Sequence, residues 1–245
     1  MMDPLFWRNV RESPADHPRA NHAEQALVTP DGPPPDTGPP PAPPFGPLTR
    51  NVSMWFMCLL QFSINVGWVF LVSWLPGYLK DFHQVPEKTG GLMSTIVLAS
   101  GICGLVCGGP LADWLLKRHG ARRGRRLQLV GAYACAAAAY VVAMQLDTAW
   151  PIVGALAVVA FMTDMSIPAI WAYMMDVGGR NAAAVFGWGN MWGNFGAAVA
   201  INLIPQINQR WDANGDWHES MVLFASAFMI AAFCASRLDP QSKVE

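Results

Sequence analysis

The sequence has little charge, few cysteines and no leading apolar segment, and each shortage excludes a class of protein. Only 13% of the 245 residues are charged, whereas a soluble domain carries about a quarter. The net charge of −1 provides no basic surface for nucleic acid. Residues 1–50 hold no apolar run as long as the core of a secretory signal. We therefore expect later hydrophobic segments to drive insertion into a lipid bilayer.

The five cysteines form no metal-binding or disulfide pattern. Cys103 and Cys107 share a helix face, but no histidine or second cysteine pair accompanies them. We interpret all five as small buried residues and expect neither a metal site nor a cofactor. No constellation of His, Cys and Ser gathers at one depth either, so the sequence does not indicate an enzyme.

Hydrophobic residues make up 53% of the chain and gather in six long segments. About 20 helical residues are needed to cross the hydrocarbon layer. The six segments are approximately Val52–Leu79, Gly91–Leu111, Leu127–Leu146, Trp150–Tyr173, Ala182–Ile204 and Met221–Arg237. The sequence therefore predicts an all-α membrane protein built as a bundle of six transmembrane helices.

The distribution of proline indicates where the domains of the chain begin, and the distribution of basic residues predicts its orientation in the membrane. Of the 20 prolines, 13 fall in residues 1–50, which predicts an extended, largely disordered cytoplasmic tail. The six-helix bundle is expected over residues 51–239, followed by a cytoplasmic C-terminal tail at 240–245. Segment Lys117–Arg126 holds six of the 16 Lys and Arg residues, so the positive-inside rule places it in the cytoplasm. Alternation then puts both termini and Asp176–Asn181 on that side of a cell membrane.

Asp164 is the main polar residue inside a predicted span. Pro168, four residues later, cannot donate to the carbonyl of Asp164, so we expect a kink there. Trp171 returns to nearly the same helix face. Asp164 and Trp171 therefore share one face of a helix that is interrupted between them. This arrangement suits a water-filled cavity at mid-membrane depth. The alternative is an Asp tied to a neighbouring helix by hydrogen bonds from Asn or Ser.

Two pairs of carboxamides occur at a spacing of four residues within predicted spans. Gln61 and Asn65 form the first pair, and Asn190 and Asn194 form the second. A carboxamide both donates and accepts hydrogen bonds, so it can bind hydroxyls or a carboxylate without burying a charge. The pairs are therefore candidate substrate ligands, and hydrogen bonding between helices is the alternative.

A further motif combines small, acidic and basic residues. Gly109 and Asp113 precede the basic run that contains Arg122 and Arg123. An acid at the end of a helix followed by arginines can form a charged latch between neighbouring helices. We interpret these four residues as a candidate gating motif.

These residues resemble the major facilitator superfamily, and within it the anion:cation symporter branch of sugar-acid and organic-anion transporters. The run Gly109…Asp113…Gly120…Arg122-Arg123 is similar to the cytoplasmic signature of that superfamily, although Trp114 stands where the signature has a basic residue. Trp74-Leu75-Pro76-Gly77-Tyr78-Leu79 resembles the end of helix 7 in this branch. Phe6…Glu24 is similar to the link that leaves helix 6, so we expect the chain to represent the C-terminal half.

The resemblance also implies roles for individual residues. Gln61, Trp171 and Asn190 match positions that line the substrate cavity in the family. The branch's arginine in helix 1 and acid in helix 4, tied to anion binding and proton coupling, have no counterpart in this chain. The implied partners are a small organic anion, a coupling proton or sodium ion, and an N-terminal six-helix half or a second copy of this chain.

The resulting hypothesis is symport of hexuronates, hexonates, hexarates or similar small anions by alternating access. In it Gln61, Trp171 and Asn190 contact the substrate, and Asp164 tunes the cavity or holds its helix. Two alternatives stay open at this point. The chain could be a half-transporter from a split or truncated gene, inactive without an N-terminal half, or a membrane interaction protein with no transport role.

Overall fold

The computed structural model of the chain describes residue 21, residues 45–211 and residues 217–244. The chain divides into two units, Met1–Ala42 and Pro43–Glu245. All regular elements among the described residues are helices, and all of them belong to the second unit. The all-α prediction is therefore confirmed for the part of the chain that the structure describes.

Most of the predicted N-terminal tail lies outside the described residues, but its last six differ from the prediction. Phe45–Arg50 form a short helix, α3, in place of an extended chain. Leu48 anchors it, with 1% of its surface exposed. The hydroxyl of Thr49 donates to the carbonyl of Phe45 at 2.9 Å, which ties the helical turn together.

The first long helical rod consists of α4 (Val52–Val69), a wider π-helical turn η2 (Phe70–Trp74) and α5 (Leu75–Asp81). Asn51 caps its start, because the side-chain oxygen accepts a hydrogen bond from the backbone N–H of Met54 at 3.2 Å. The wide turn comes just before Pro76, which lacks the N–H that a regular helix needs.

The helix α6 (Glu87–Ala143) is a hairpin of two arms that meet at Gly120. Gly120 has φ 76° and ψ 167°, a backbone conformation that glycine adopts without a steric penalty. The amide of Gln128 in the second arm donates to the carbonyl of Gly108 in the first arm at 3.0 Å. The predicted basic loop is thus helical on both sides of Gly120.

The helices α7 (Ala149–Met165) and α8 (Ile167–Gly178) form the next rod, interrupted at Ser166. Pro168 occupies the first turn of α8, where its missing N–H does no harm. The kink expected beside Pro168 is therefore confirmed. The hydroxyl groups of Ser166 and Tyr133 lie 2.8 Å apart, which joins the break to the second arm of α6.

After the short 3₁₀ turn η3 (Gly179–Asn181) come α9 (Ala182–Trp211) and α10 (His218–Arg237). Four helical stretches of the described chain are long and apolar enough to cross a membrane: Val52–Asp81, Glu87–Ala143, Ala149–Gly178 and His218–Arg237. The expected count of six crossings stays a prediction.

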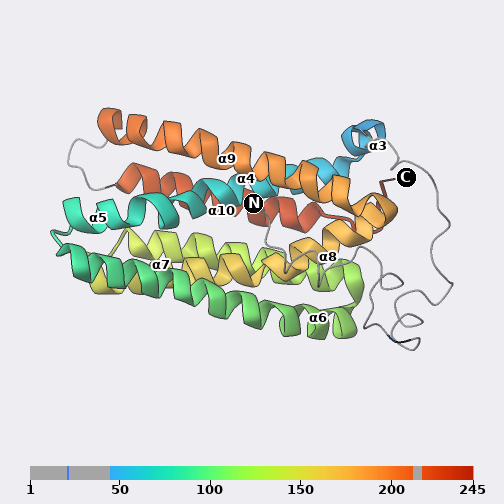
Figure 1. The fold of residues 1–245 in the computed structure, drawn as a ribbon, viewed down its shortest axis with the longest axis horizontal. Helices are drawn as coiled ribbons and strands as arrows, with labels where there is room; N and C mark the ends of the chain where they lie inside the picture. The colour runs from blue at the N-terminus through green and yellow to red at the C-terminus, as the bar shows by residue number, and fades with distance from the viewer. Residues whose placement is uncertain (1–20, 22–44, 212–216, 245) are drawn as a thin grey trace. The chain divides into compact units, whose positions relative to one another are not determined.

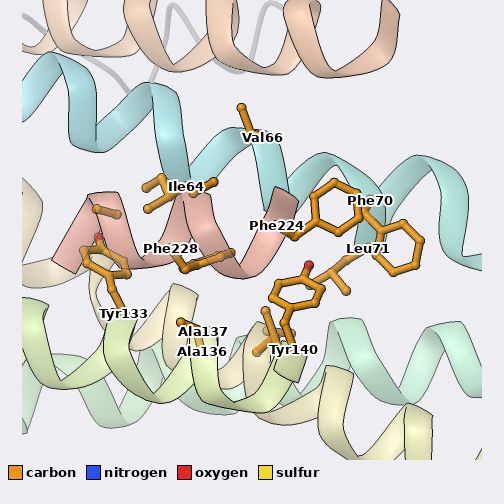
Figure 2. Packing of buried hydrophobic residues seen from close by; sticks show 14 of the residues in the cluster. Ile64, Val66, Phe70, Leu71, Tyr133, Ala136, Ala137, Tyr140, Phe224 and Phe228 are labelled. Carbon is orange, nitrogen blue, oxygen red and sulfur yellow. The ribbon is translucent and has the colours of Figure 1, made fainter. Parts of the chain in front are cut away.

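Within the second unit the long helices run side by side along a common direction, and α10 packs against both α4 and α6 (Figure 1). Figure 2 shows the centre of this packing, where Phe224 of α10 meets Phe70 and Tyr140, and Phe228 of α10 meets Tyr140. The buried hydroxyl of Tyr140 donates to the carbonyl of Gly67 at 2.9 Å. Aromatic side chains therefore hold α4, α6 and α10 as one core.

The chain's last described residues do not form a free tail. The backbone N–H of Val244 donates to the carbonyl of Val177 at 2.9 Å, and Val244 is 1% exposed. The amide of Asn51 donates to the carbonyl of Ser242 at 2.9 Å. Residues 238–244, which we call the C-terminal strap, thus pack across the start of α4 and the end of α8.

The interpretation of the cysteines as buried is wrong for three of them. Cys58 and Cys234 are buried, but Cys103, Cys107 and Cys135 lie exposed on the outside of α6. The reason is that a membrane helix is apolar on its outer face as well as inside. Apolar surroundings in the sequence therefore do not indicate burial within the protein.

Candidate functional site

The polar residues of α4 lie beside α7 and α8 at the break in that rod. Gln61, Asn65 and Trp68 come from α4, whereas Thr163 and Asp164 come from the last turn of α7. Together with Ile167, Ile170 and Trp171 of α8, and with Ile64, they line a cavity of about 220 Å³. The break thus exposes one turn of α7 and one of α8 to the same space.

A second cavity of about 390 Å³ lies next to the first along α4, α8 and α9. It is lined by Gln61, Trp171, Met174, Phe186, Gly187 and Asn190. Gln61 and Trp171 line both cavities, so the two spaces meet at these side chains. Trp171 is 55% exposed, which means that much of its indole surface is open to a bound molecule.

Five of the six predicted substrate ligands line these cavities, and the sixth does not. Gln61, Asn65, Asp164, Trp171 and Asn190 all contribute to the lining. Asn194 is exposed outside both, and its amide donates to the carbonyl of Asn190 in its own helix at 2.9 Å. Which residues contact a substrate stays a prediction.

Among the described residues, no hydrogen bond joins Gln61, Asn65, Asn190 or Asn194 to a neighbouring helix. The amide of Asn65 donates to the carbonyl of Gln61 at 2.8 Å, also within its own helix. The side-chain oxygen Oε1 of Gln61 is buried and has no hydrogen-bond partner among the described residues. A buried acceptor without a partner is destabilising, so a donor from a ligand, from water or from another protein segment would stabilise it.

Close helix packing fixes the position of two of these polar residues. A Cβ atom at Gly101 of α6 would overlap the carboxylate of Asp164, and one at Gly193 of α9 would lie 2.9 Å from Nδ2 of Asn65. Only glycine leaves room for these side chains between the helices. No hydrogen bond from Asn or Ser reaches Asp164 within the described residues, so the alternative of a tied carboxylate is not observed there.

The charge of the cavities is as informative as their shape. Among the described residues that line them, Asp164 is the one ionisable side chain, and it is an acid. No lysine or arginine of the described chain is present in either lining. Neutral carboxamides and an indole can bind hydroxyl groups and sugar faces, whereas a positive partner for an anion must come from outside these residues.

Several lining residues were not predicted from the sequence. Trp68 lies three residues after Asn65 and seven after Gln61 on α4, so its helical spacing was the available signal. Thr163 precedes Asp164 directly, and its hydroxyl donates to the carbonyl of Val159 at 2.7 Å. Phe186 and Gly187 carry no signal of their own, because an apolar residue in a membrane helix faces lipid, protein or a cavity with equal ease.

The candidate gating residues lie at the end of the bundle near Gly120. Arg122 pairs with Asp239 of the C-terminal strap at 3.2 Å. The neighbouring Arg125 pairs with Asp176 of α8 at 2.6 Å. Asp113 and Arg123 are exposed and form no ion pair within the described residues, and Gly109 is partly buried. The arginines therefore connect α6 to other segments, but not to Asp113.

The opposite end of the bundle holds a separate cavity of about 300 Å³, to which Tyr78, His83, Asp147 and His218 contribute. The hydroxyl of Tyr78 and Nε2 of His83 lie 3.0 Å apart. Partial burial lowers the pKa of the His83 imidazole. No group of three His, Cys, Asp or Glu residues suited to a metal ion occurs in the part of the chain that the structure describes.

Comparison with known proteins points to one family. A family model described as Major Facilitator Superfamily matches residues 4–201. A probable L-galactonate transporter of Escherichia coli (strain K12) is 29% identical over 163 residues, which are 65% of this chain and 35% of that protein.

Two further relatives carry similar names. A probable galactarate/D-glucarate transporter of the same strain is 27% identical over 149 residues, covering 60% of this chain and 33% of its own length. A probable galactarate/D-glucarate transporter of Bacillus subtilis (strain 168) is 23% identical over 236 residues, covering 93% of this chain and 51% of its own length. The chain thus spans about a third to a half of the relatives it matches.

Proposed function

Since the chain belongs to the major facilitator superfamily, we propose that it forms the C-terminal six-helix half of a secondary transporter for small organic anions. In this arrangement α6 crosses the bilayer twice, once with each arm. The rod of α4 and α5, the rod of α7 and α8, α9 and α10 provide the other four crossings. The hairpin at Gly120 supports the first point, because Gln128 packs back against Gly108.

The observation that carries the proposal is the pair of adjoining cavities. Gln61 and Trp171 line both, and Asn190 lines the second. The proposed substrates are hexuronates, hexonates, hexarates and similar acids, whose hydroxyl groups suit carboxamide partners and whose ring or chain can lie on an indole. The names of the relatives, which refer to galactonate, galactarate and glucarate, support this class.

The charge of the cavities supports a second half. The described lining contains an acid, Asp164, and no basic residue, so it does not neutralise an anion by itself. We propose that the positive charge comes from an N-terminal six-helix half, or a second copy of this chain, facing the cavities. Alternating access by rocking of one half against the other would then expose the site to each side in turn, coupled to a proton or to sodium.

The ion pairs near Gly120 fit the inner gate of such a transporter. We propose that this end faces the cytoplasm of a cell membrane, since it holds the basic segment Lys117–Arg126. The start of α4, Asp176 and the C-terminal strap lie at the same end, as the contacts of Asn51, Arg125 and Val244 indicate. Gly109, Asp113, Arg122 and Arg123 would form the moving contact of the gate.

The proposal can be tested by measuring the uptake of labelled hexonates and hexuronates. The cells should express the chain together with a matching N-terminal half. Asn190→Ala should lower the uptake at equal expression, because Asn190 lines the second cavity. The matched variant is Asn194→Ala, which changes the same residue type one turn further along α9 and outside both cavities. It should retain most of the uptake.

Two outcomes would contradict the proposal. An absence of uptake in every pairing, with both halves inserted in the membrane, would exclude transport but not the fold. Equal losses for both asparagine variants would mean that the cavities are not the substrate site. Uptake by the chain expressed alone would show that a second copy replaces the N-terminal half.

A further inference from the structure

The C-terminal strap is fixed by hydrogen bonds to the start of α4. The backbone N–H of Asp239 donates to the hydroxyl oxygen of Ser53 at 2.8 Å. The hydroxyl of Ser242 and the side-chain oxygen of Asn51 lie 3.1 Å apart, and the amide of Asn51 donates to the carbonyl of Ser242. The C-terminal strap is therefore held in a defined position against α4.

The strap borders an open cavity of about 670 Å³ between the end of α3, the start of α4 and the end of α10. The cavity is lined by Pro47, Arg50, Asn51, Val52, Ser53, Phe56, Arg237, Asp239, Ser242 and Lys243. It is separate from the two cavities around Gln61. No residue lines both it and either of them.

The lining is strongly basic. Arg50, Arg237 and Lys243 contribute positive charges, and Asp239 is the single acid. One carboxylate oxygen of Asp239 already pairs with Arg122 at 3.2 Å, and the other accepts a hydrogen bond from the backbone N–H of Gln241 at 3.2 Å. The lining thus carries three positive charges against one negative charge, and the negative one already pairs with Arg122, so the cavity presents a net positive charge to a ligand.

An apolar surface adjoins the basic cavity. Val52 of α4 is 67% exposed and Phe233 of α10 is 55% exposed. The ring of Phe56 packs edge-on against that of Phe233, with 6.5 Å between their centres. The guanidinium of Arg237 lies 5.1 Å from the centre of the Phe233 ring, so a basic group and an apolar face are held next to each other.

We propose that this cavity binds an anionic phospholipid, with Arg50, Arg237 and Lys243 around the headgroup phosphate and an acyl chain along Val52, Phe56 and Phe233. Basic pockets at the ends of membrane helices suit phosphate headgroups, and guanidinium groups bind phosphate oxygens in pairs. A free phosphate would use the basic residues only and leave the exposed apolar surface uncovered. The lipid matches both parts, and this inference does not depend on the transport proposal.

Binding can be measured on the purified full chain in detergent by native mass spectrometry, with phosphatidylglycerol, phosphatidylcholine and inorganic phosphate added separately. Phosphatidylglycerol should bind at lower concentration than phosphatidylcholine. Arg50→Gln combined with Arg237→Gln should weaken phosphatidylglycerol binding by roughly tenfold or more, and Lys243→Gln alone by about fivefold. The matched control is Lys117→Gln with Arg118→Gln, two exposed bases of α6 outside the cavity.

The apolar part of the proposal is tested by Phe233→Ser, which should weaken the binding of phosphatidylglycerol and leave that of phosphate unchanged. Equal weakening by the control pair would show that general surface charge attracts the lipid, which would overturn the proposal. Phosphate binding as tight as that of phosphatidylglycerol, with the same loss in the variants, would show a site for free anions. If the variant with both Arg50→Gln and Arg237→Gln loses its helical circular dichroism, the single variant Lys243→Gln, at an exposed position, becomes the test. Unchanged binding of phosphatidylglycerol by that single variant would contradict the proposal.

Discussion

Two helix contacts in this protein use glycine to bring backbones together, but they are held in different ways. In the contact of α6 with α7, Gly104 and Gly108 face the backbone of Phe161 and Met165. In the contact of α4 with α9, Gly196 faces the backbone of Phe62. Both contacts therefore depend on the absence of a side chain.

Hydrogen bonds distinguish the two contacts. The hydroxyl of Ser100 on α6 donates to the carbonyl of Ala157 on α7 at 2.8 Å. The amide of Gln128 donates to the carbonyls of both Gly108 and Met165, at 3.0 and 2.9 Å. Between the described residues of α4 and α9 no such bond occurs, and aromatic rings such as Phe62 and Phe195 meet instead.

The difference indicates which contact can change. Bonds that cross from one helix to another fix both distance and rotation, because a small shift breaks them. Packed glycine and aromatic surfaces tolerate a shift more easily. Since α9 carries Asn190 into the second cavity, the more adjustable contact belongs to a wall of the candidate site. The fixed wall is α7, which α6 holds and which contributes Thr163 and Asp164 to the first cavity.

The largest effect is expected from Gly104→Ala. The added Cβ would overlap the carbonyl of Phe161, and backbone atoms cannot move aside within a contact that hydrogen bonds also hold. The loss should be near the upper end for overpacking, about 3 kcal/mol, so the melting temperature in detergent should fall by roughly 6–12 °C. Gly131→Ala, on the same hairpin with nothing within 4 Å of the new atom, should melt at or slightly above the temperature of the parent protein, because alanine favours the helix. Equal melting of both variants would contradict a tight contact.

A smaller loss is expected from Gln128→Met. The methionine keeps the approximate length of the side chain but removes the donor that serves two carbonyls. Lost hydrogen bonds of this kind destabilise by about 1–2 kcal/mol, which thermal melting detects. Gln206→Met is the matched control, because Gln206 is exposed and bonds only to Asn202 in its own helix. If both variants lose the same stability, hydrogen bonds do not distinguish the two helix contacts.

The sequence predicted the break between α7 and α8, but it did not predict that both helical arms of α6 extend to Gly120. A missing N–H at Pro168 has a local consequence that can be read from one residue. In contrast, the charges of Lys117–Arg126 lower the hydropathy of this segment, which predicts a loop between two helices. The residue types Lys, Arg, Leu and Ala nevertheless all favour a helical backbone. The helix preference holds on both sides of the turn, and within α6 only Gly120 leaves the helical conformation.

Residue type predicted most of the polar residues that line the cavities, but it did not predict where the cavities end. Asn190 and Asn194 share a helix face, yet one lines a cavity and the other does not. The second cavity touches α9 only along Phe186, Gly187 and Asn190, and its extent depends on the packing of other helices. The C-terminal strap was missed for a similar reason, since its partners lie far away in the sequence.

The next prediction tests the more adjustable contact. Gly196→Ala would place a Cβ against the carbonyl of Phe62, as severe an overlap as at Gly104. Because no side-chain hydrogen bond to a backbone carbonyl joins the described residues of α4 and α9, the helices can separate slightly, and alanine also favours the helix. The loss should be about 1 kcal/mol, or roughly 2–4 °C in melting temperature. A loss as large as that of Gly104→Ala would remove the distinction between the contacts.

The smallest effect is expected from Gly189→Ala, on the same helix as Gly196. Its Cβ would lie 2.5 Å from the terminal methyl of Met174 on α8, so the overlap is with the far end of a side chain and not with backbone. Methionine has flexible torsions and can turn away, so the melting temperature should change by less than about 2 °C. Gly187→Ala is the matched control, because it lies on the same helix and nothing lies within 4 Å of its added Cβ. If Gly189→Ala melts far below Gly187→Ala, α9 is held rigidly against α8. The adjustable wall of the site would then be limited to its contact with α4.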